Sequence, residues 1–430
     1  MATAVQSGSI APVDAGTTID TPASSTRLAT LDFIRGVAVL GILATNILQL
    51  ANLPGAHRWL PLIGEPALAD KILWALNYLF VDGKLRGLFA MLFGAGLVLF
   101  MDRAKGKGVN AYWLQFRRLF WLALFGLLHF FLFFEGDILF HYALFGMVAM
   151  FLVRLLPAKW LLIGGMLLYV ADSPLSSLDL GGWARDEARI LALPADNQER
   201  IDYLREQDEF VAETRAEGEL QAHGSLPEIV AERVEHRGMD PLYDTPFMIM
   251  DSFACMLFGA ALFRMGFFSG GWDRRKMIRW GSIGIVATIV MCLPFIVWVW
   301  AKDFPQGLNM FVFYGPSHAI RLPMMLGYAA VLVAMTPVWA ATGIGKRLSA
   351  AGRMAFTNYL GASMVMAFIF QGWGLGLYGQ FMRPGMELFV LFGWALMLVC
   401  SPWWLARFRY GPLEYLWRCL TYWKLFPLRR

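Results

Sequence analysis

Long apolar runs are the feature that most constrains what this chain can fold into. Val37–Leu53, Leu119–Phe134 and Ile283–Trp300 contain no Asp, Glu, Lys or Arg. With its flanking residues, each run is long enough to cross a hydrocarbon core of about 30 Å as a helix. Apolar residues make up 58% of the chain and charged residues 16%, whereas soluble domains have about 45–50% and 25%. An ordinary soluble enzyme, a disordered chain and a collagen-like fibre are therefore excluded.

The runs predict an all-α, polytopic transmembrane bundle. Only helices fit, because unpaired backbone groups in lipid are costly and no long alternating strand pattern appears. A further apolar stretch, Ile72–Phe80, is too short to span and predicts an interfacial or re-entrant helix. We expect about ten spans, near residues 32–52, 84–101, 114–134, 137–156, 158–172, 246–266, 278–301, 318–340, 350–370 and 386–406.

The distribution of basic residues predicts the orientation of these spans. If the N-terminus is cytoplasmic, the inside segments carry 23 of the 37 Lys and Arg residues. Seven of the other bases lie in one long loop, which the positive-inside rule largely ignores. The sequence therefore predicts a multi-pass membrane protein with both termini in the cytoplasm. The net charge of +5 is explained by basic residues at the cytoplasmic ends of the spans. Such residues set the topology and contact anionic lipids, so no nucleic-acid partner is expected.

The same pattern divides the chain into five parts. The long loop holds 17 acidic residues and seven arginines, and Asn197–Gln221 has helix-like apolar spacing. It predicts an extracytoplasmic helical insert, either lid-like or merely solvated. Residues 1–27 lack the apolar segment of a signal peptide and predict a disordered tail. The expected parts are the tail 1–27, membrane half one at 28–172, the acidic insert 173–245, membrane half two at 246–406 and a basic cytoplasmic tail at 407–430.

A first line of polar residues follows the first span. Asp32 and Arg35 are spaced i,i+3 and are expected to pair on one helix face. Asn46 follows Arg35 by eleven residues, which returns it to nearly the same face about 16 Å along the axis. His57 comes another eleven residues later. Charged groups in a membrane usually serve a purpose; the alternative is a snorkelling arginine, a helix-start aspartate and a loop histidine.

A second group lies around the third and fourth spans. Asp137 and His141 are spaced i,i+4, and His129 precedes them in the outer half of span three. A carboxylate beside an imidazole can fix its tautomer and raise its basicity, as acid–base catalysis requires. The same contact also serves as plain inter-helix packing. Arg117 and Arg118 mark the cytoplasmic end of span three.

Other features are less specific. Lys84 and Arg86 precede a glycine-rich helix segment, and His318 and Arg321 lie at the outer edge of span eight. Nucleotide-binding and serine-nucleophile motifs are absent. None of the four cysteines forms a CxxC pair, so neither a disulfide framework nor a metal site is predicted.

Five motifs give the chain a resemblance to the YeiB-like family of bacterial membrane proteins, a family of unknown function. They are LDFIRGVAVLGILATN at residues 31–46, LFAMLFGAG at 88–96, RRLFWLALFGLLHFFLFFEGDILFHYALFG at 117–146, GRMAFTNYL at 352–360 and GPLEYLWRCLTY at 411–422. Together they are specific, and the resemblance covers nearly the whole chain outside the N-terminal tail and the acidic insert.

That family resembles a wider set of integral-membrane acyltransferases. Acyltransferase-3 proteins carry Arg-x10-His in the first span, whereas here the second position is Asn46. The heparan glucosaminide N-acetyltransferases carry Arg-x10-Asn-x10-His, which Arg35, Asn46 and His57 match at both spacings. In that group the Asn orients substrate and the His acts in acetyl transfer from cytoplasmic coenzyme A.

The resemblance implies an acyltransferase with acyl-coenzyme A as donor. His129, Asp137 and His141 lack the tight spacing of metal ligands, so no metal is predicted. The donor is expected near Arg35, Arg117 and Arg118, with Lys84 as a further binding residue. A small-molecule or glycan acceptor is expected on the outer side, with His57 or the Asp137–His141–His129 group removing its proton and Asn46 orienting it. A transporter or exporter is the alternative, and a third reading is a non-catalytic membrane organiser. The lipid bilayer is the expected environment, and a homo-oligomer is possible.

Overall fold

The computed structural model describes residues 22–430, which are almost entirely helical. The predicted tail of residues 1–27 lies largely outside this range, and helix α1 begins at Pro22. The longer helices are α1 (Pro22–Leu50), α2 (Leu68–Phe80), α3 (Lys84–Gly106), α4 (Ala111–Leu132), α5 (Leu139–Leu155), α6 (Ala158–Leu191), α7 (Gln198–His223), α8 (Leu226–Arg237), α11 (Ala254–Arg264), α12 (Arg274–Ala301), α13 (Gln306–Tyr314), α14 (Pro316–Trp339), α15 (Gly343–Arg353), α16 (Ala355–Phe370), α17 (Arg383–Arg407) and α18 (Pro412–Tyr422). Short helical turns join them: η1 (Leu60–Ile63), α9 (Asp240–Tyr243), α10 (Thr245–Met248), the π-helical η2 (Ile249–Phe253) and η3 (Phe267–Ser269).

The membrane architecture agrees with the predicted all-α bundle. Within the described residues, eight helical segments are long and apolar enough to cross a membrane. They fall at eight of the ten predicted positions, with α2 and α3 counted as one segment. The other two positions hold the shorter apolar helices α5 and α16. Ten spans therefore remains a prediction, while the multi-pass helical fold is confirmed.

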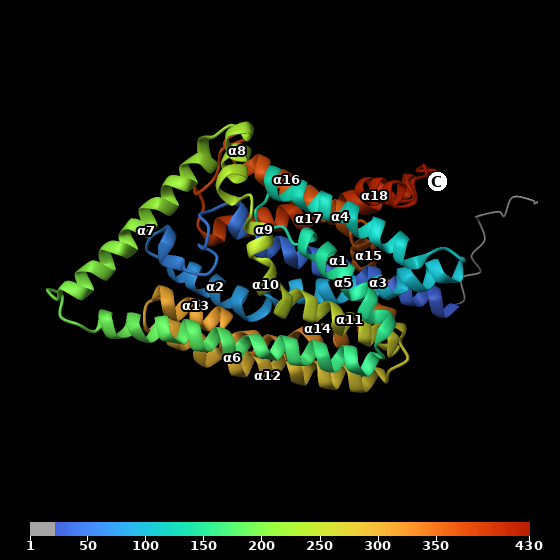
Figure 1. The fold of residues 1–430 in the computed structure, drawn as a ribbon, viewed down its shortest axis with the longest axis horizontal. Coiled ribbons are helices and arrows are strands. Elements are labelled where there is room, and N and C mark those ends of the chain that lie inside the picture. Colours follow the sequence, from blue (N-terminus) through green and yellow to red (C-terminus); the bar gives the residue numbers. More distant parts are fainter. Residues whose placement is uncertain (1–21) are drawn as a thin grey trace, which may run out of the picture.

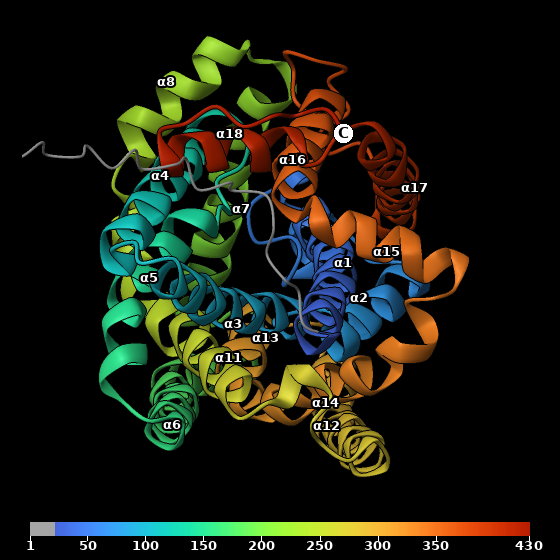
Figure 2. The ribbon, with the colours of Figure 1, turned by 90° about the vertical axis from the view of Figure 1, so that its right-hand side faces the viewer.

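The helices form one elongated bundle with distinct ends (Figure 1). The start of α1 and the C-terminus lie at the same end, and α7 lies at the opposite end (Figure 1). Both termini on one side is what an even number of crossings predicts. Viewed along its length, the bundle surrounds α1, which contacts α3, α14, α15, α16 and α17 (Figure 2).

Glycines permit the closest helix contacts in this bundle. A Cβ atom on Gly36 of α1 would overlap the carbonyl of Leu348 in α15, and one on Gly352 would overlap the carbonyl of Asp32. Small residues at such crossings let backbones approach closely, which is how membrane helices gain packing energy without a hydrophobic drive. The first span is therefore fixed against α15 at the level of Arg35.

The acidic insert is helical and docks on the end of the bundle opposite the start of α1 (Figure 1). The predicted helix at Asn197–Gln221 is α7, and α6 continues through Pro174 to Leu191, so the predicted boundary at residue 173 falls inside a helix. Glu187 near the end of α6 accepts hydrogen bonds from the Tyr203 hydroxyl of α7 (2.8 Å) and from the Leu308 amide of α13 (3.1 Å). The insert is thus joined to the membrane body by specific contacts.

The C-terminal helix α18 docks on the start of α16. Glu414 of α18 accepts hydrogen bonds from the backbone amides of Phe356 (2.8 Å) and Thr357 (3.1 Å), so its carboxylate caps the N-terminus of α16. A carboxylate is favourable there because these amides lack partners within the helix and the helix dipole is positive at that end. Burial raises the pKa of Glu414 above its usual value.

Candidate functional site

A buried carboxylate–imidazole pair connects the end of α4 to the start of α5. Asp137 Oδ1 lies 2.7 Å from His129 Nδ1, and both side chains are almost completely buried. The second carboxylate oxygen accepts the backbone amide of Phe140 at 2.9 Å. Gly126 packs against this carboxylate, where a Cβ atom would lie 2.8 Å from Oδ2. We call Asp137 and His129 the acid–base pair.

Tyr359 of α16 joins the acid–base pair to the first span. Its ring centroid lies 5.2 Å from that of His129, and its hydroxyl accepts the amide of Ile138 at 3.4 Å. The hydroxyl also interacts with the side chain of Asn46 in α1. Helices α1, α4 and α16 therefore bring three polar side chains to one place in the bundle.

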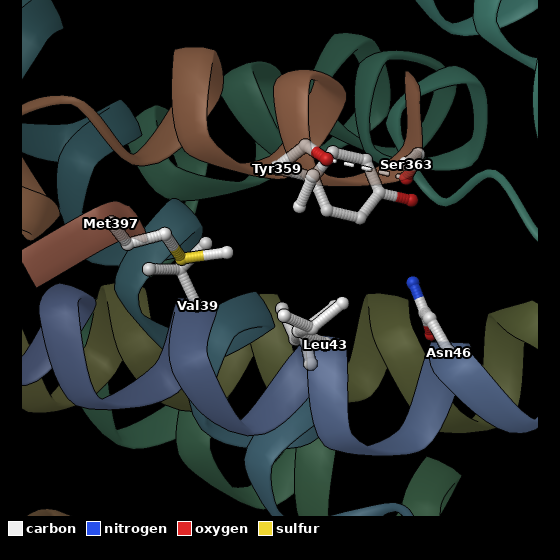
Figure 3. A pocket seen from close by; sticks show the side chains of 8 residues that line it. Val39, Leu43, Asn46, Tyr359, Ser363 and Met397 are labelled. Atoms are coloured by element: carbon white, nitrogen blue, oxygen red, sulfur yellow. Dashed lines mark hydrogen bonds between the residues drawn. The ribbon is translucent and has the colours of Figure 1, made fainter. Parts of the chain in front are cut away.

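A small cavity opens between Asn46 and Tyr359. Figure 3 shows the amide of Asn46 and the hydroxyls of Tyr359 and Ser363 facing it from opposite sides. The space open to the centre of a water molecule is about 10 Å³, room for about one water. Its other walls are apolar, formed by Val39, Ile42, Leu43, Ala362 and Met397.

His57 reaches the same region from the loop between α1 and η1. Its Nε2 lies 3.4 Å from the Nε2 of Gln49, and Gln49 lies against Gly136, which precedes Asp137. His57 is 7% exposed. Burial, together with the neighbouring charges of Arg58 and Arg383, lowers the pKa of His57 well below 6.5. His57 is therefore neutral at pH 7.

His141 does not join the acid–base pair. Its ring is buried and packs on Phe140 and Phe145, and neither ring nitrogen has a side-chain hydrogen-bond partner among the described residues. Its polar surroundings include Pro241 and Asp244 of the insert's last turns. The i,i+4 spacing correctly places His141 near Asp137, but the carboxylate is held by His129 and by Phe140 instead.

The arginines predicted for donor binding gather at the end of the bundle that holds both termini. Arg35 pairs with Asp32 at 3.1 Å, as predicted. The Arg118 guanidinium lies between the rings of Phe100 (4.7 Å) and Trp417 (4.5 Å). Aromatic faces stabilise a guanidinium while leaving its N–H groups free for an anion.

Arg117 also contacts the C-terminal segment that holds Trp417. Its guanidinium lies 5.4 Å from the ring of Trp423, and one N–H donates to the carbonyl of Leu420 at 3.5 Å. Residues of α18 and the turn after it therefore cover both Arg117 and Arg118. We call Arg35, Arg117 and Arg118 the basic end.

The structure places Lys84 apart from the basic end. Lys84 begins α3, whereas Arg35 lies against Gly96 of the same helix. Twelve residues separate those positions, which corresponds to about 18 Å of helix. Lys84 is fully buried in a different polar cluster with Asp82 and Arg321.

Sequence reasoning missed several residues of this site. Tyr359 lies within the GRMAFTNYL motif, yet nothing in its spacing shows that it meets Asn46. Gln49 shares the C-terminal half of α1 with Asn46 and was detectable as a second polar residue in an apolar run. Glu135 and Arg233 are joined at 3.2 Å across 98 residues, a pairing that no local pattern encodes.

The insert holds the loop that carries Asp137. Arg233 of α8 is 2% exposed and donates to Glu135 Oε1 (3.2 Å), to the carbonyl of Phe131 (3.2 Å) and to Gln221 Oε1 (3.2 Å). Arg237 donates to Glu135 Oε2 at 2.7 Å. Two arginines of α8 therefore hold the turn between α4 and α5 through hydrogen bonds.

Comparison with known proteins identifies the family of the chain. The model of the family described as "Protein of unknown function (DUF418)" matches residues 262–424. The chain is 32% identical over 397 residues to "Uncharacterized protein YeiB" of Escherichia coli (strain K12), covering 92% of this chain and 96% of that protein. The chain belongs to the YeiB-like family. Its multi-pass helical fold and its bacterial relatives indicate the bacterial inner membrane.

A second YeiB-like relative extends over the same length. "Uncharacterized protein YxaH" of Bacillus subtilis (strain 168) is 31% identical over 432 residues, covering 94% of this chain and 96% of the relative. No solved structure shows a significant match. The family assignment therefore confirms the resemblance to YeiB-like proteins, while the likeness to acyltransferases stays a prediction.

Proposed function

We propose that this YeiB-like protein is a membrane acyltransferase. It would move an acyl group from cytoplasmic acyl-coenzyme A to a hydroxyl or amine on the outer side. The observation that carries the proposal is the buried contact between Asp137 and His129 beside Tyr359 and Asn46. Such a pair of a base and its orienting carboxylate is what proton abstraction in acyl transfer needs.

The proposal requires one tautomer of His129. With Nδ1–H donating to Asp137, the Nε2 lone pair of His129 is free to accept a proton. Within the described residues this Nε2 is buried and has no hydrogen-bond partner. Nε2 would take the acceptor's proton while the acceptor oxygen or nitrogen attacks the thioester carbonyl. The tetrahedral intermediate would then expel the coenzyme A thiolate, which recovers the proton from His129.

Two hydrogen-bond donors would stabilise the oxyanion of that intermediate. The Asn46 amide and the Tyr359 hydroxyl face the same cavity (Figure 3). Donors aimed at developing charge in a water-poor site lower the barrier most. His57, which is neutral and contacts Gln49, is the second candidate base. This role is consistent with the motif formed by Arg35, Asn46 and His57. Direct transfer and an acyl-His57 intermediate are both compatible with this arrangement.

The basic end supports the location of the donor. Arg35, Arg117 and Arg118 face the side of both termini, and guanidinium groups suit phosphates. Arg35 and Asn46 lie on nearly the same face of α1, about 16 Å apart along the axis. The cavity at Asn46 holds about one water in this state, so acyl entry requires α16 or α17 to move away from α1.

The insert fits the role of a lid on the acceptor side. It grips the Asp137 loop through Arg233 and Arg237, and α7 leaves a cleft of about 390 Å³ beside Trp59. That volume is within the range of small-molecule pockets. A small-molecule or glycan acceptor would approach from this side.

The test is thiol release by the purified full chain in detergent. Wild-type protein is incubated with acetyl-coenzyme A and a panel of amines, sugars and alcohols. The proposal expects acceptor-dependent thiol release that falls strongly in Asp137→Asn and in His129→Gln, and is unchanged in the exposed control His223→Gln. No release from wild-type protein across a broad panel would overturn it.

Transport is the alternative function, and a separate observation favours it. Buried charged residues lie where α2–α3 and α13–α14 are interrupted, away from the acid–base pair. Interrupted helices with polar contents are typical of transporter binding sites. Flux of a small solute into liposomes containing the protein, without thiol release in detergent, would assign transport instead of acyl transfer.

A further inference from the structure

Two junctions between consecutive helices, α2–α3 and α13–α14, lie at neighbouring points inside the bundle. Helix α2 ends at Phe80 and α3 begins at Lys84, with Gly83 in the left-handed region at φ 72°. Helix α13 ends at Tyr314 and α14 begins at Pro316. Leu85 lies against Gly41, which is in the middle of α1, so the first interruption lies at mid-depth in the bundle.

Side chains connect the two interruptions. The Tyr78 hydroxyl of α2 hydrogen-bonds to the Ser317 hydroxyl of α14. The Lys84 ammonium donates to the carbonyl of Tyr78, and the Arg321 guanidinium donates to the carbonyl of Phe313. Each cation therefore donates to a carbonyl near the C-terminal end of the preceding helix, Lys84 to α2 and Arg321 to α13. We call Lys84, Arg321 and their partners the broken-helix centre.

One cation of the broken-helix centre has no ion-pair partner of its own. Arg321 pairs with Asp82 at 3.2 Å, and Arg86 pairs with Asp251 of the π-helical turn η2. Lys84 is completely buried, yet among the described residues no carboxylate lies within ion-pair distance of its ammonium.

The other polar groups nearby do not give Lys84 an ion-pair partner. Asp172 of α6 lies 3.2 Å from His318 of α14 and is not within ion-pair distance of Lys84. The Lys84 ammonium lies 5.2 Å from the centre of the Tyr78 ring, which carries no carboxylate. Lys84 is therefore left without a carboxylate partner among the described residues.

Arg321 has an unsatisfied hydrogen-bond donor. Its Nε is buried without a partner among the described residues, and the residue is only 5% exposed. The N-termini of α3 and α14 point the positive ends of their dipoles at this region. An unpaired cation and unpaired donors in a low-dielectric interior are costly unless an anion satisfies them.

We propose that the broken-helix centre binds a small anion, such as chloride or a short carboxylate, between Lys84 and Arg321. Half-helix N-termini and basic side chains receive anions in other interrupted membrane helices. The ligand must be small, because Arg321 packs so closely on Gly83 that a Cβ there would lie 2.8 Å from Nη1. The site does not depend on acyl transfer, since it shares no residue with the acid–base pair.

The first test is anion-dependent thermal unfolding of the full chain in detergent. Chloride and acetate are titrated separately at constant ionic strength, balanced with a bulky organic sulfonate. We expect a saturable rise in Tm for wild-type protein, its loss in Lys84→Met and its retention in Lys84→Arg. The matched control is Lys71→Met, because Lys71 already has the carboxylate of Asp303 at 2.9 Å and its loss should not change the anion response.

The second test needs no variant, so it remains informative if Lys84→Met fails to fold. Wild-type protein is expected to broaden the ³⁵Cl resonance of chloride, and acetate is expected to reverse the broadening if the site accepts carboxylates. Broadening that acetate leaves unchanged assigns the site to halide-sized anions. Absence of broadening, or a Tm that follows ionic strength alone, would overturn the proposal and identify Lys84 as a neutral, structural lysine.

Discussion

Arg233 Nε of the insert lies 3.2 Å from Glu135 Oε1, two residues before Asp137. A helix in the acidic insert is thereby bonded to the turn that presents the proposed catalytic carboxylate. The contact is buried on the arginine side, since the Arg233 side chain is 3% exposed and Glu135 is 25% exposed. The insert is thus a structural part of the candidate site.

Removing this contact should loosen the insert. Arg233→Met leaves Glu135 with Arg237 alone and strands the carbonyl of Phe131. Since hydrogen bonds to charged groups are worth about 1.5–3 kcal/mol each, we expect the free energy of unfolding to fall by about 2–4 kcal/mol. Limited digestion with a glutamate-specific protease should cleave α7, which contains several glutamates, faster than in wild-type protein. Arg205→Met, an exposed arginine of α7, is the control; equal digestion of Arg233→Met and wild type would contradict the clamp.

The acid–base pair should behave as one unit in catalysis. Asp137→Asn and His129→Gln are each expected to lower kcat by about 10²–10⁴-fold, because each removes proton transfer. The double variant should be hardly worse than either single one, since residues that act together are strongly non-additive. Thiol release with the best acceptor measures this. Additive losses would show that the two residues act independently.

Arg118 should affect donor binding more than turnover. Arg118→Gln removes a guanidinium held between Phe100 and Trp417. We expect KM for acyl-coenzyme A to rise about 10-fold, the cost of losing about 1.4 kcal/mol of phosphate contact, with little change in kcat. Arg407→Gln is the matched control, because Arg407 also lies over a tryptophan, Trp403, but at an exposed position. An unchanged KM would remove the basic end from the donor site.

His57 should make the protein less stable at acidic pH. Its pKa in the folded protein lies well below 6.5, so between the two pKa values the unfolded chain binds more protons than the folded one. Stability therefore rises with pH in this interval, and the contribution of His57 is fully present above pH 6.5 and lost as pH falls. Unfolding at pH 8, 6 and 5 should show a larger acid loss for wild type than for His57→Gln, while His223→Gln follows wild type. Equal slopes for wild type and His57→Gln would refute the assignment.

The α1–α15 crossing should not tolerate larger residues. Gly352→Ala places a methyl group against the Asp32 carbonyl of α1. Overpacking of this kind costs about 1–3 kcal/mol, which thermal unfolding in detergent would detect as a lower Tm. Gly361→Ala is the control, because a Cβ there meets no atom within 4 Å. A normal Tm for Gly352→Ala would mean that the two helices separate readily.

The sequence predicted the features that depend on local spacing. The apolar runs placed the membrane helices, the i,i+3 interval placed Asp32 beside Arg35, and the charged stretch Asn197–Gln221 formed α7. The contact between His129 and Asp137 followed from their position around one short turn. In each of these cases the determining residues lie within a few turns of one another.

Contacts between distant segments were not predictable in this way. Tyr359 meets Asn46 from a helix more than 300 residues later, and Trp417 donates to the carbonyl of Arg118 across 299 residues. A single sequence does not specify which helices become neighbours. It also did not show that Lys84 faces Asp82 and Arg321 rather than the basic end, because membrane charges are paired by the bundle and not by the helix that carries them.

The cap that Glu414 places on α16 ties the end of the chain to its centre. Tyr359 follows the capped amides of Phe356 and Thr357 by less than one helical turn. Shortening the protein before residue 414 would therefore release the first turn of the helix that presents this tyrosine to the acid–base pair. At the C-terminal end, affinity handles and fluorescent fusions should therefore follow α18 and not replace it, and a version truncated before Glu414 would be an unsuitable reference for activity measurements.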